Sequence, residues 1–416
     1  MRSLISFPPF RRDVKLLLAA TGLLAISFFG IQMLLKILYI LRLGYGPEYL
    51  GLFNAAGAVG YMGMSLPSGA LGARFGLTRV MFAGALIAAL GMGLLPFTEV
   101  LPSWAQYSWP IITQVILSAG YAMYSINLAP ALMVVTSPEN RNSAYALSST
   151  LRSLGTLVGT LFGGLLPGFF GLLLSLELSD PGPYRWALWL SALLALAALV
   201  PLVQLRRAEQ NTQEPGETAP GAFPLWPVAL LVLYVSLSQA ASATCQSFCS
   251  AFMDTELQLS PAVIGVITSA GQFVAVLAPL SGPRLARRHG NGWTLMMATL
   301  GSAFSLLPLI LLPTVLGVGV GRFGTLVLAA MWMPALQVYQ MEMVERRWRA
   351  LAYGAVSMAM GLSFGAISFT GGYVVASWGY TALFLLGLAV STLGALLMWG
   401  MLRRPALAVA VGGTVR

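Results

Sequence analysis

The sequence predicts an all-α membrane protein with twelve transmembrane helices in two pseudo-symmetric bundles of six. Of its 416 residues, 57% are hydrophobic and only 9% are charged, against about 25% charged in ordinary soluble domains. Apolar runs of about 20 residues, long enough to cross the hydrocarbon core, recur along the whole chain. A chain with so few charges cannot cover itself with a polar surface, so we expect it to lie in lipid.

A repeat divides the chain into two similar halves. The same residue types return after a constant spacing of 208 positions, about half the chain. The recurring residues are Arg141 and Tyr145 with Arg349 and Tyr353, and Gly163-Gly164 with Gly371-Gly372. A repeat of this length in so apolar a chain indicates two related membrane bundles.

The expected elements follow from the apolar runs. The twelve spans are predicted at residues 14–41, 48–72, 80–98, 109–135, 144–170, 185–205, 226–252, 261–282, 293–313, 322–344, 351–376 and 379–402. The first run is too long for a signal-peptide core, so we expect it to be retained. The polar segment 206–225 is rich in Gln, Glu, Pro, Gly and Thr and is predicted to be a cytoplasmic linker. The expected domains are therefore 1–205, the linker 206–225, and 226–416, which includes a short cytoplasmic tail.

Positive charges set the expected orientation. Eighteen Arg and Lys residues fall at one set of span ends, and four fall at the other: Lys36, Arg42, Arg185 and Arg322. The positive-inside rule therefore predicts that both termini are cytoplasmic. The net charge of +10 favours contact with anionic membrane lipids and not with nucleic acid. Arginine outnumbers lysine twenty-one to two, which is typical of a GC-rich bacterial genome, and the expected location is a bacterial inner membrane.

Cysteine and histidine usage gives little support for a metal, cofactor or redox site. Cys245 and Cys249 lie one helical turn apart in an apolar run and are interpreted as packing residues. His289, the one histidine, lies in an Arg-rich loop. Since no nucleophile–base pair or metal cluster is apparent, we expect neither an enzyme nor a cofactor.

The loop after the second span reads Gly69-Ala-Leu-Gly-Ala-Arg74-Phe-Gly76-Leu-Thr-Arg79. It resembles the signature loop of the major facilitator superfamily, G-x-L-x-D-R-x-G-R-R. An echo, Pro283-Arg-Leu-Ala-Arg-Arg288-His-Gly290, follows the eighth span, where that family repeats the loop. The resemblance covers essentially the whole chain and implies a monomeric transporter, with Arg141 and Arg349 in further repeated loops. Ala73 stands where the family has an aspartate that helps latch the two halves, so this latch is missing or replaced.

The fifth span resembles a second family motif. Its glycines, with Thr160 among them, resemble the g-x-x-x-G-P-x-x-G-G pattern of the family's antiporters, although threonine replaces the proline. The glycines are Gly155, Gly159, Gly163 and Gly164, and a helix-packing seam explains them equally well. The antiporters' arginine motif in the fourth span is absent, because Ile116 occupies the arginine position. This weakens a drug-exporter interpretation.

The resemblance implies a solute cavity lined mainly by spans one, four, seven and ten. Each of these spans carries polar and aromatic residues at helical spacing. They are Phe28, Phe29, Gln32 and Lys36; Gln114, Tyr121, Tyr124, Ser125 and Asn127; Gln239, Ser242 and Gln246; and Trp332, Met333, Gln337, Tyr339 and Gln340. The alternative is that they hydrogen-bond neighbouring helices.

Charges inside spans are candidates for function. Arg152 could pair with Glu139 or Glu342 or meet an anionic substrate, while Lys36 could extend to the lipid headgroups. Of thirteen carboxylates, only Asp254 and Glu342 come near a cavity span. The predicted function is alternating-access transport of a small organic solute, with export considered. The alternatives are uptake of an organic anion or sugar using Arg152 and Lys36, or a non-transporting receptor or scaffold.

Overall fold

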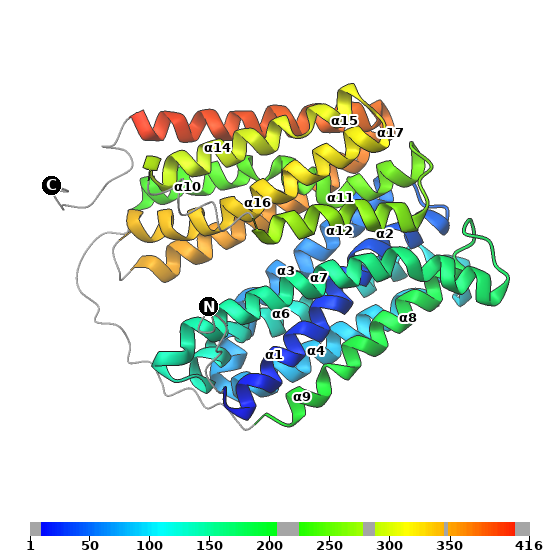
Figure 1. The fold of residues 1–416 in the computed structure, drawn as a ribbon, viewed down its shortest axis with the longest axis horizontal. Helices are drawn as coiled ribbons and strands as arrows, with labels where there is room; N and C mark the ends of the chain where they lie inside the picture. Colours follow the sequence, from blue (N-terminus) through cyan, green and yellow to red (C-terminus); the bar gives the residue numbers. More distant parts are fainter. Residues whose placement is uncertain (1–9, 206–223, 278–287, 345–347, 404–416) are drawn as a thin grey trace, which may run out of the picture. The chain divides into compact units, whose positions relative to one another are not determined.

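A computed structural model describes residues 10–205, 224–277, 288–344 and 348–403 (Figure 1). These residues form helices and turns, and the described part of the chain contains no strand. Most of the expected linker, residues 206–223, lies outside the described residues.

The first half supplies six spans. They are α1 (Arg12–Leu24), η1 (Ala25–Gln32) and α2 (Met33–Arg42) in one continuous span; α3 (Pro47–Phe75); α4 (Leu77–Leu94) with η2 (Leu95–Val100); α6 (Trp109–Val135), preceded by the short α5 (Ser103–Gln106); α7 (Pro138–Leu174); and α8 (Gly182–Ala197) with α9 (Leu199–Val203). Apolar composition explains their length, because a backbone in lipid must satisfy its own hydrogen bonds.

The second half supplies the others. They are α10 (Leu225–Ser238) with α11 (Ala240–Thr255); α12 (Pro261–Leu277); α14 (Asn291–Phe304) with α15 (Leu307–Leu311); α16 (Val315–Met343); and α17 (Arg349–Arg403). The last of these changes direction at Gly379, which has φ 78° and ψ 174°. Glycine adopts this conformation at little cost, so α17 contains two spans.

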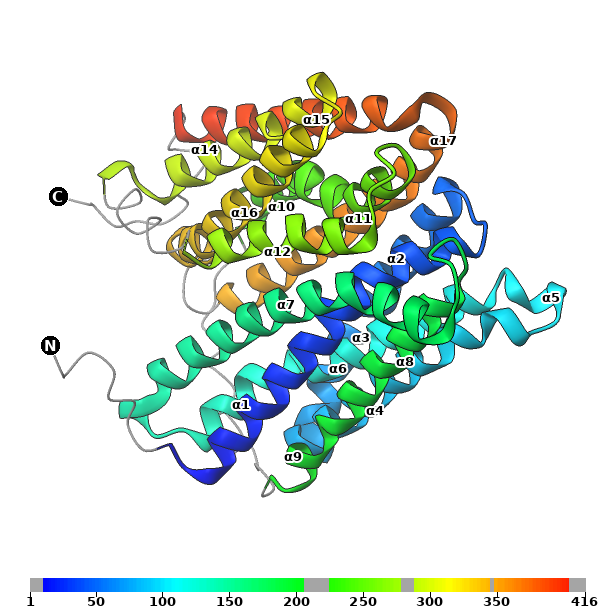
Figure 2. The same ribbon diagram turned by 45° about the vertical axis from the view of Figure 1, so that its right-hand side comes forward.

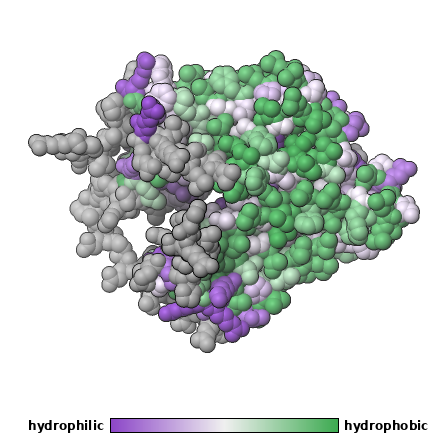
Figure 3. Space-filling model, viewed as in Figure 1, coloured by the Kyte–Doolittle hydropathy of each residue, from purple (hydrophilic) through white to green (hydrophobic). Residues whose placement is uncertain are grey.

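The span count agrees with the sequence. Nine helices of the described chain are long and apolar enough to cross a membrane. The apolar helices α3 and α12 and the break inside α17 bring the described total to the twelve that were expected. Figure 3 shows apolar side chains over most of the face drawn, with hydrophilic side chains gathered toward its margins. Such a surface is suited to lipid.

Contacts divide the chain into two units. Unit 1 contains residues 1–45, 56–213 and 260–269, and unit 2 contains residues 46–55, 214–259 and 270–416. The core of unit 1 includes Leu17, Met81 and Leu117, all buried. The core of unit 2 includes Tyr234 and Met398, also buried.

Three glycines of α7 lie against the first span, whereas Gly164 lies against Gly265 of α12. Helix α7 and the first span run side by side in both views (Figure 1, Figure 2). A methyl group added at Gly155 would come 2.8 Å from Ala25 Cβ, and one added at Gly159 would overlap the carbonyl oxygen of Ile26. One added at Gly163 would lie 3.1 Å from Cα of Ile31. Small residues permit this close backbone approach, which drives helix association where the hydrophobic effect cannot.

Candidate functional site

Aromatic rings from three spans gather in unit 1. Phe28 stacks on Tyr121 with ring centroids 4.1 Å apart and an interplanar angle of 18°. Phe29 meets Tyr121 edge to face at 5.2 Å, and Tyr61 of α3 lies 6.3 Å from it at 29°. These four rings, called the aromatic cluster below, are half-buried, so their neighbours do not cover them fully.

A local change of helix type occurs where Phe28 and Phe29 share one partner. In an α-helix, successive side chains point about 100° apart. The segment η1 is instead a π-helix, and at its end the N–H of Met33 donates to the carbonyl of Phe28, five residues back. This wider turn is rare and is often found at functional sites. It accompanies an arrangement in which both phenylalanine rings touch Tyr121.

Arg152 completes the cluster. Its guanidinium lies near enough to the Tyr121 hydroxyl to act on it electrostatically, while much of the side chain stays exposed. Among the described residues, no carboxylate forms an ion pair with Arg152. Glu342, one of the expected partners, instead accepts hydrogen bonds of 3.2 Å from Asn291; the side chain of Glu139 lies outside the description.

Tyr124 and Asn127 form hydrogen bonds to neighbouring helices. Tyr124 is buried and shares a 3.0 Å hydrogen bond with the Thr21 hydroxyl of α1. The Asn127 amide is buried too and donates to the Ser68 hydroxyl of α3 at 2.9 Å. These contacts join α6 to α1 and α3, and they are the kind of interhelical hydrogen bond that the packing alternative expects.

Gln32 and Lys36 lie inside unit 1. Gln32 accepts a 3.3 Å hydrogen bond from Ser191, while its buried Nε2 has no hydrogen-bond partner among the described residues. The Lys36 ammonium donates to Gln114 Oε1 at 3.4 Å, and the side chain is only 6% exposed. Lys36 therefore lies within the helix bundle and does not extend to the headgroups.

In unit 2, Trp332 also forms a hydrogen bond to a neighbouring helix. Its indole N–H donates to the Tyr234 hydroxyl at 2.9 Å, and that hydroxyl shares a 2.8 Å bond with Thr299. The glutamines of unit 2 differ in exposure: Gln239 and Gln246 are half-buried, Gln337 is exposed, and Gln340 is buried. The structure thus brings predicted aromatic residues of unit 1 together, while the predicted glutamines of unit 2 differ in burial.

Arg322 is a buried charge that was expected at a span end. Helix α16 begins at Val315, about two turns earlier than expected, so Arg322 lies inside the span and is 7% exposed. Its NH1 donates to the Cys245 carbonyl at 2.7 Å and approaches the Cys245 sulfur at 3.4 Å. No described carboxylate pairs with it. The missed signal was Thr314, whose side chain caps the helix by accepting from the N–H of Gly317.

The repeated loops have matching backbones. Gly76 links α3 to α4 with φ 94°, and Gly290 precedes α14 with φ 88°. Only glycine adopts this conformation readily, which explains its return in the second loop. The other loop residues differ in environment: Gly69, Arg74, Arg79 and Arg288 are exposed, Arg141 is half-buried, and the side chain of Arg349 lies outside the description.

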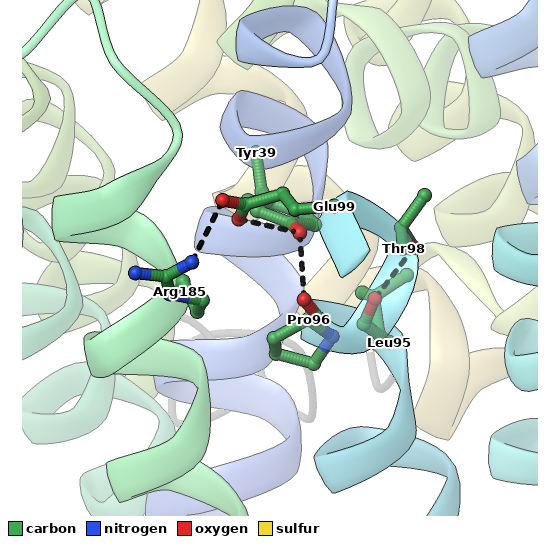
Figure 4. Close-up of polar contacts among 6 residues, drawn as sticks. All are labelled: Tyr39, Leu95, Pro96, Thr98, Glu99 and Arg185. Carbon is green, nitrogen blue, oxygen red and sulfur yellow. Dashed lines mark hydrogen bonds and ion pairs between the residues drawn. The ribbon is translucent and has the colours of Figure 1, made fainter. Parts of the chain in front are cut away.

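A polar network joins three spans at one end of unit 1 (Figure 4). Glu99 accepts from the Tyr39 hydroxyl at 2.9 Å and pairs with Arg185 at 2.9 Å. Tyr39 lies in the first span, Glu99 at the end of the third and Arg185 in the sixth. The network fixes these ends against one another and lies in a different part of the unit from the aromatic cluster.

Twelve apolar spans among the described residues define a multi-pass membrane protein, and polar side chains buried inside such spans are often functional. The sequence model of the Major Facilitator Superfamily matches residues 17–243 and 231–413. The chain therefore belongs to the Major Facilitator Superfamily and is a membrane transporter, not an enzyme. This confirms the predicted family and fold class.

Similar proteins differ in what they carry. The chain is 26% identical over 161 residues to a multidrug resistance protein, MdtH, of Aeromonas hydrophila, covering 38% of this chain and 39% of that protein. It is 29% identical over 128 residues to a glucose/galactose transporter of Brucella abortus, covering 30% of each. The matches thus span about two fifths or less of these relatives.

The structural likeness is more extensive. The crystal structure of a mutant of the nucleoside transporter NupG superposes with a TM-score of 0.76 and covers 93% of this chain and 99% of that one. At 15% sequence identity, this likeness concerns the fold alone.

Proposed function

We propose that the chain moves a small amphipathic organic solute across the membrane by alternating access, in the direction of export. The observation that carries the proposal is the aromatic cluster with Arg152 at its edge. Its rings are half-buried and not fully enclosed by unit 1. Binding sites for small molecules typically combine apolar rings with a few polar groups in this way.

The proposed contacts have separate roles. Phe28 and Tyr121 offer ring faces and edges, and such ring pairs contribute about 0.5–1.5 kcal/mol beyond area burial. Tyr61 and Ser125, whose hydroxyls are 3.2 Å apart, offer hydrogen bonds on the same side of α6. Within unit 2, Gln246 and Gln337 remain proposed contacts.

The direction and orientation belong to the proposal. Export is supported by the name of one relative, the multidrug resistance protein MdtH, whereas another is named for glucose and galactose. The excess of positive charge in the loops supports cytoplasmic termini. In alternating access, a bound solute is exposed to one side of the membrane at a time, and membership of the family supports this mechanism here.

No carboxylate of the described residues hydrogen-bonds to the aromatic cluster or pairs with Arg152. Asp254 is buried in α11, and Glu342 contacts Asn291. The proposed mechanism therefore contains no proton-transfer step within the cluster.

Tyr121→Ala tests the site. We expect counterflow of a transported solute in proteoliposomes to fall at least tenfold, because Tyr121 contacts both phenylalanines and lies near Arg152. The solute is first chosen by a thermal-shift screen of the purified transporter. Trp104→Ala is the matched control, because Trp104 is exposed and outside the cluster, and it should transport normally. Unchanged counterflow in Tyr121→Ala would remove the cluster from the transport site.

A further inference from the structure

The position of Arg152 bears on the charge of the solute. We propose that the aromatic cluster selects planar aromatic solutes that carry a negative charge and rejects organic cations of the same shape. This inference rests on the proposed function, because it assigns a substrate class to the same site. It takes up the anion-carrier alternative and places the selectivity in contacts within unit 1.

The surroundings of the Tyr121 side chain show which groups such a solute would need, namely a flat ring and a polar group attached to it. Its ring stacks on Phe28, while the Arg152 guanidinium lies near its hydroxyl and acts on it electrostatically. A ring-stacking surface and a cation therefore lie near one another in unit 1. A flat ring with a directly attached carboxylate carries the two complementary groups, and we expect it to stack on the cluster with its acid group toward Arg152.

Arg152 suits a carboxylate in particular. A guanidinium stays charged in proteins and offers paired N–H donors that match the two oxygens of a carboxylate. The side chain makes no ion pair with any acid in the described residues, and part of it is exposed. Its donors are therefore not committed to a protein carboxylate there.

The same arginine opposes cations. Aromatic faces without a neighbouring charge attract ammonium and amidinium groups through their quadrupoles. Four rings would therefore form a favourable cation site if Arg152 were neutral. A fixed positive charge near the Tyr121 hydroxyl repels a second cation, and repulsion is stronger in a partly desolvated site than in water. Removing the charge should therefore reverse the preference of the site as well as weaken binding.

Three ligands of nearly equal shape test this directly: benzoate, benzamide and benzamidinium, with charges of −1, 0 and +1. Their affinities for the purified full-length transporter in detergent would be measured by isothermal titration calorimetry. We expect benzoate to bind at least tenfold more tightly than benzamidinium. Cyclohexanecarboxylate, which has the charge but not the flat ring, should bind severalfold more weakly than benzoate.

Arg152→Gln should weaken benzoate at least tenfold and strengthen benzamidinium, because the rings remain and the repulsion is gone. Arg152→Lys should keep the anion preference with reduced affinity, since it retains the charge without the paired donors. Arg12→Gln removes an exposed arginine of α1 that contacts Gln204, and it should leave all affinities unchanged. Arg152→Lys also gives a result if Arg152→Gln does not fold.

Benzamidinium binding as tight as benzoate in the wild-type protein would overturn the inference, as would an unchanged ranking in Arg152→Gln. Binding of none of the ligands would also count against it. If another solute then showed counterflow that depended on Tyr121, the proposed function would stand and only the charge selectivity would be wrong. If no solute showed counterflow, the proposed function itself would fail.

Discussion

Replacing Gly159 with leucine is expected to prevent unit 1 from folding. Even the first carbon of a side chain at this position would overlap the Ile26 carbonyl and lie 2.8 Å from Cα of Gly30. Those atoms are backbone and cannot rotate away, so α7 and the first span would have to separate. Overpacking of a close interface typically costs about 1–3 kcal/mol, and leucine adds several carbons where none fits. The measurement is the yield of monodisperse protein on size-exclusion chromatography in detergent.

Gly168 provides the control on the same helix. A Cβ added at Gly168 has no atom within 4 Å, so Gly168→Leu should give normal yield and an unfolding temperature close to that of the wild type. Both variants add the same apolar side chain to α7, so the comparison isolates the interface. Normal yield of Gly159→Leu would contradict the close packing of α7 on the first span.

Replacing Arg322 with alanine is expected to destabilise unit 2 by about 3 kcal/mol, the usual range for deleting a long buried side chain. The change removes the hydrogen bond from NH1 to the Cys245 carbonyl and leaves a cavity beside Thr325, which also contacts Cys245. The expected observation is a fall of several degrees in the unfolding temperature of the purified protein. A variant as stable as the wild type would show that Arg322 is not buried in this contact.

Arg322→Met separates the effect of the lost side-chain volume from the effect of the lost charge. Methionine restores most of the volume without a charge to bury, and an apolar replacement of a buried charged group is often neutral or stabilising. We therefore expect Arg322→Met to recover most of the stability lost in Arg322→Ala. If methionine were as damaging as alanine, the charge itself would be required, and an anion facing Arg322 would have to exist.

The spans could be predicted from the sequence because each depends on a local property. A run of about 20 apolar residues is long enough to cross the hydrocarbon core wherever it occurs in a chain. The twelve expected spans accordingly all have counterparts among the described helices. Span ends were harder to place. Arg322 was expected at an end because a charge interrupts the hydropathy pattern, whereas the helix begins at its Thr314 cap.

The site could be predicted only in part, because a side chain's role depends on its neighbours in other helices. Helical spacing predicted Tyr121, Tyr124 and Asn127 on one side of the same span. Tyr121 lies in the half-buried cluster, whereas the other two are buried and hydrogen-bond to neighbouring helices. Spacing alone cannot separate these roles. The π-helical turn could not be predicted either, because hydropathy does not show which type of helix contains Phe28 and Phe29.

The central claim is that the face carrying Tyr121 is exposed to each side of the membrane in turn. Ser125 lies one turn from Tyr121 and is half-buried, and Ser125→Cys introduces a thiol of similar size. The native cysteines interfere little, because Cys245 is 1% exposed and Cys249 0%. The measurement is the rate of labelling of Ser125→Cys by a membrane-impermeant maleimide, applied separately to each side of oriented vesicles. We expect labelling from both sides, slowed by a transported solute. Labelling from one side only, and unaffected by solute, would contradict alternating access at this face.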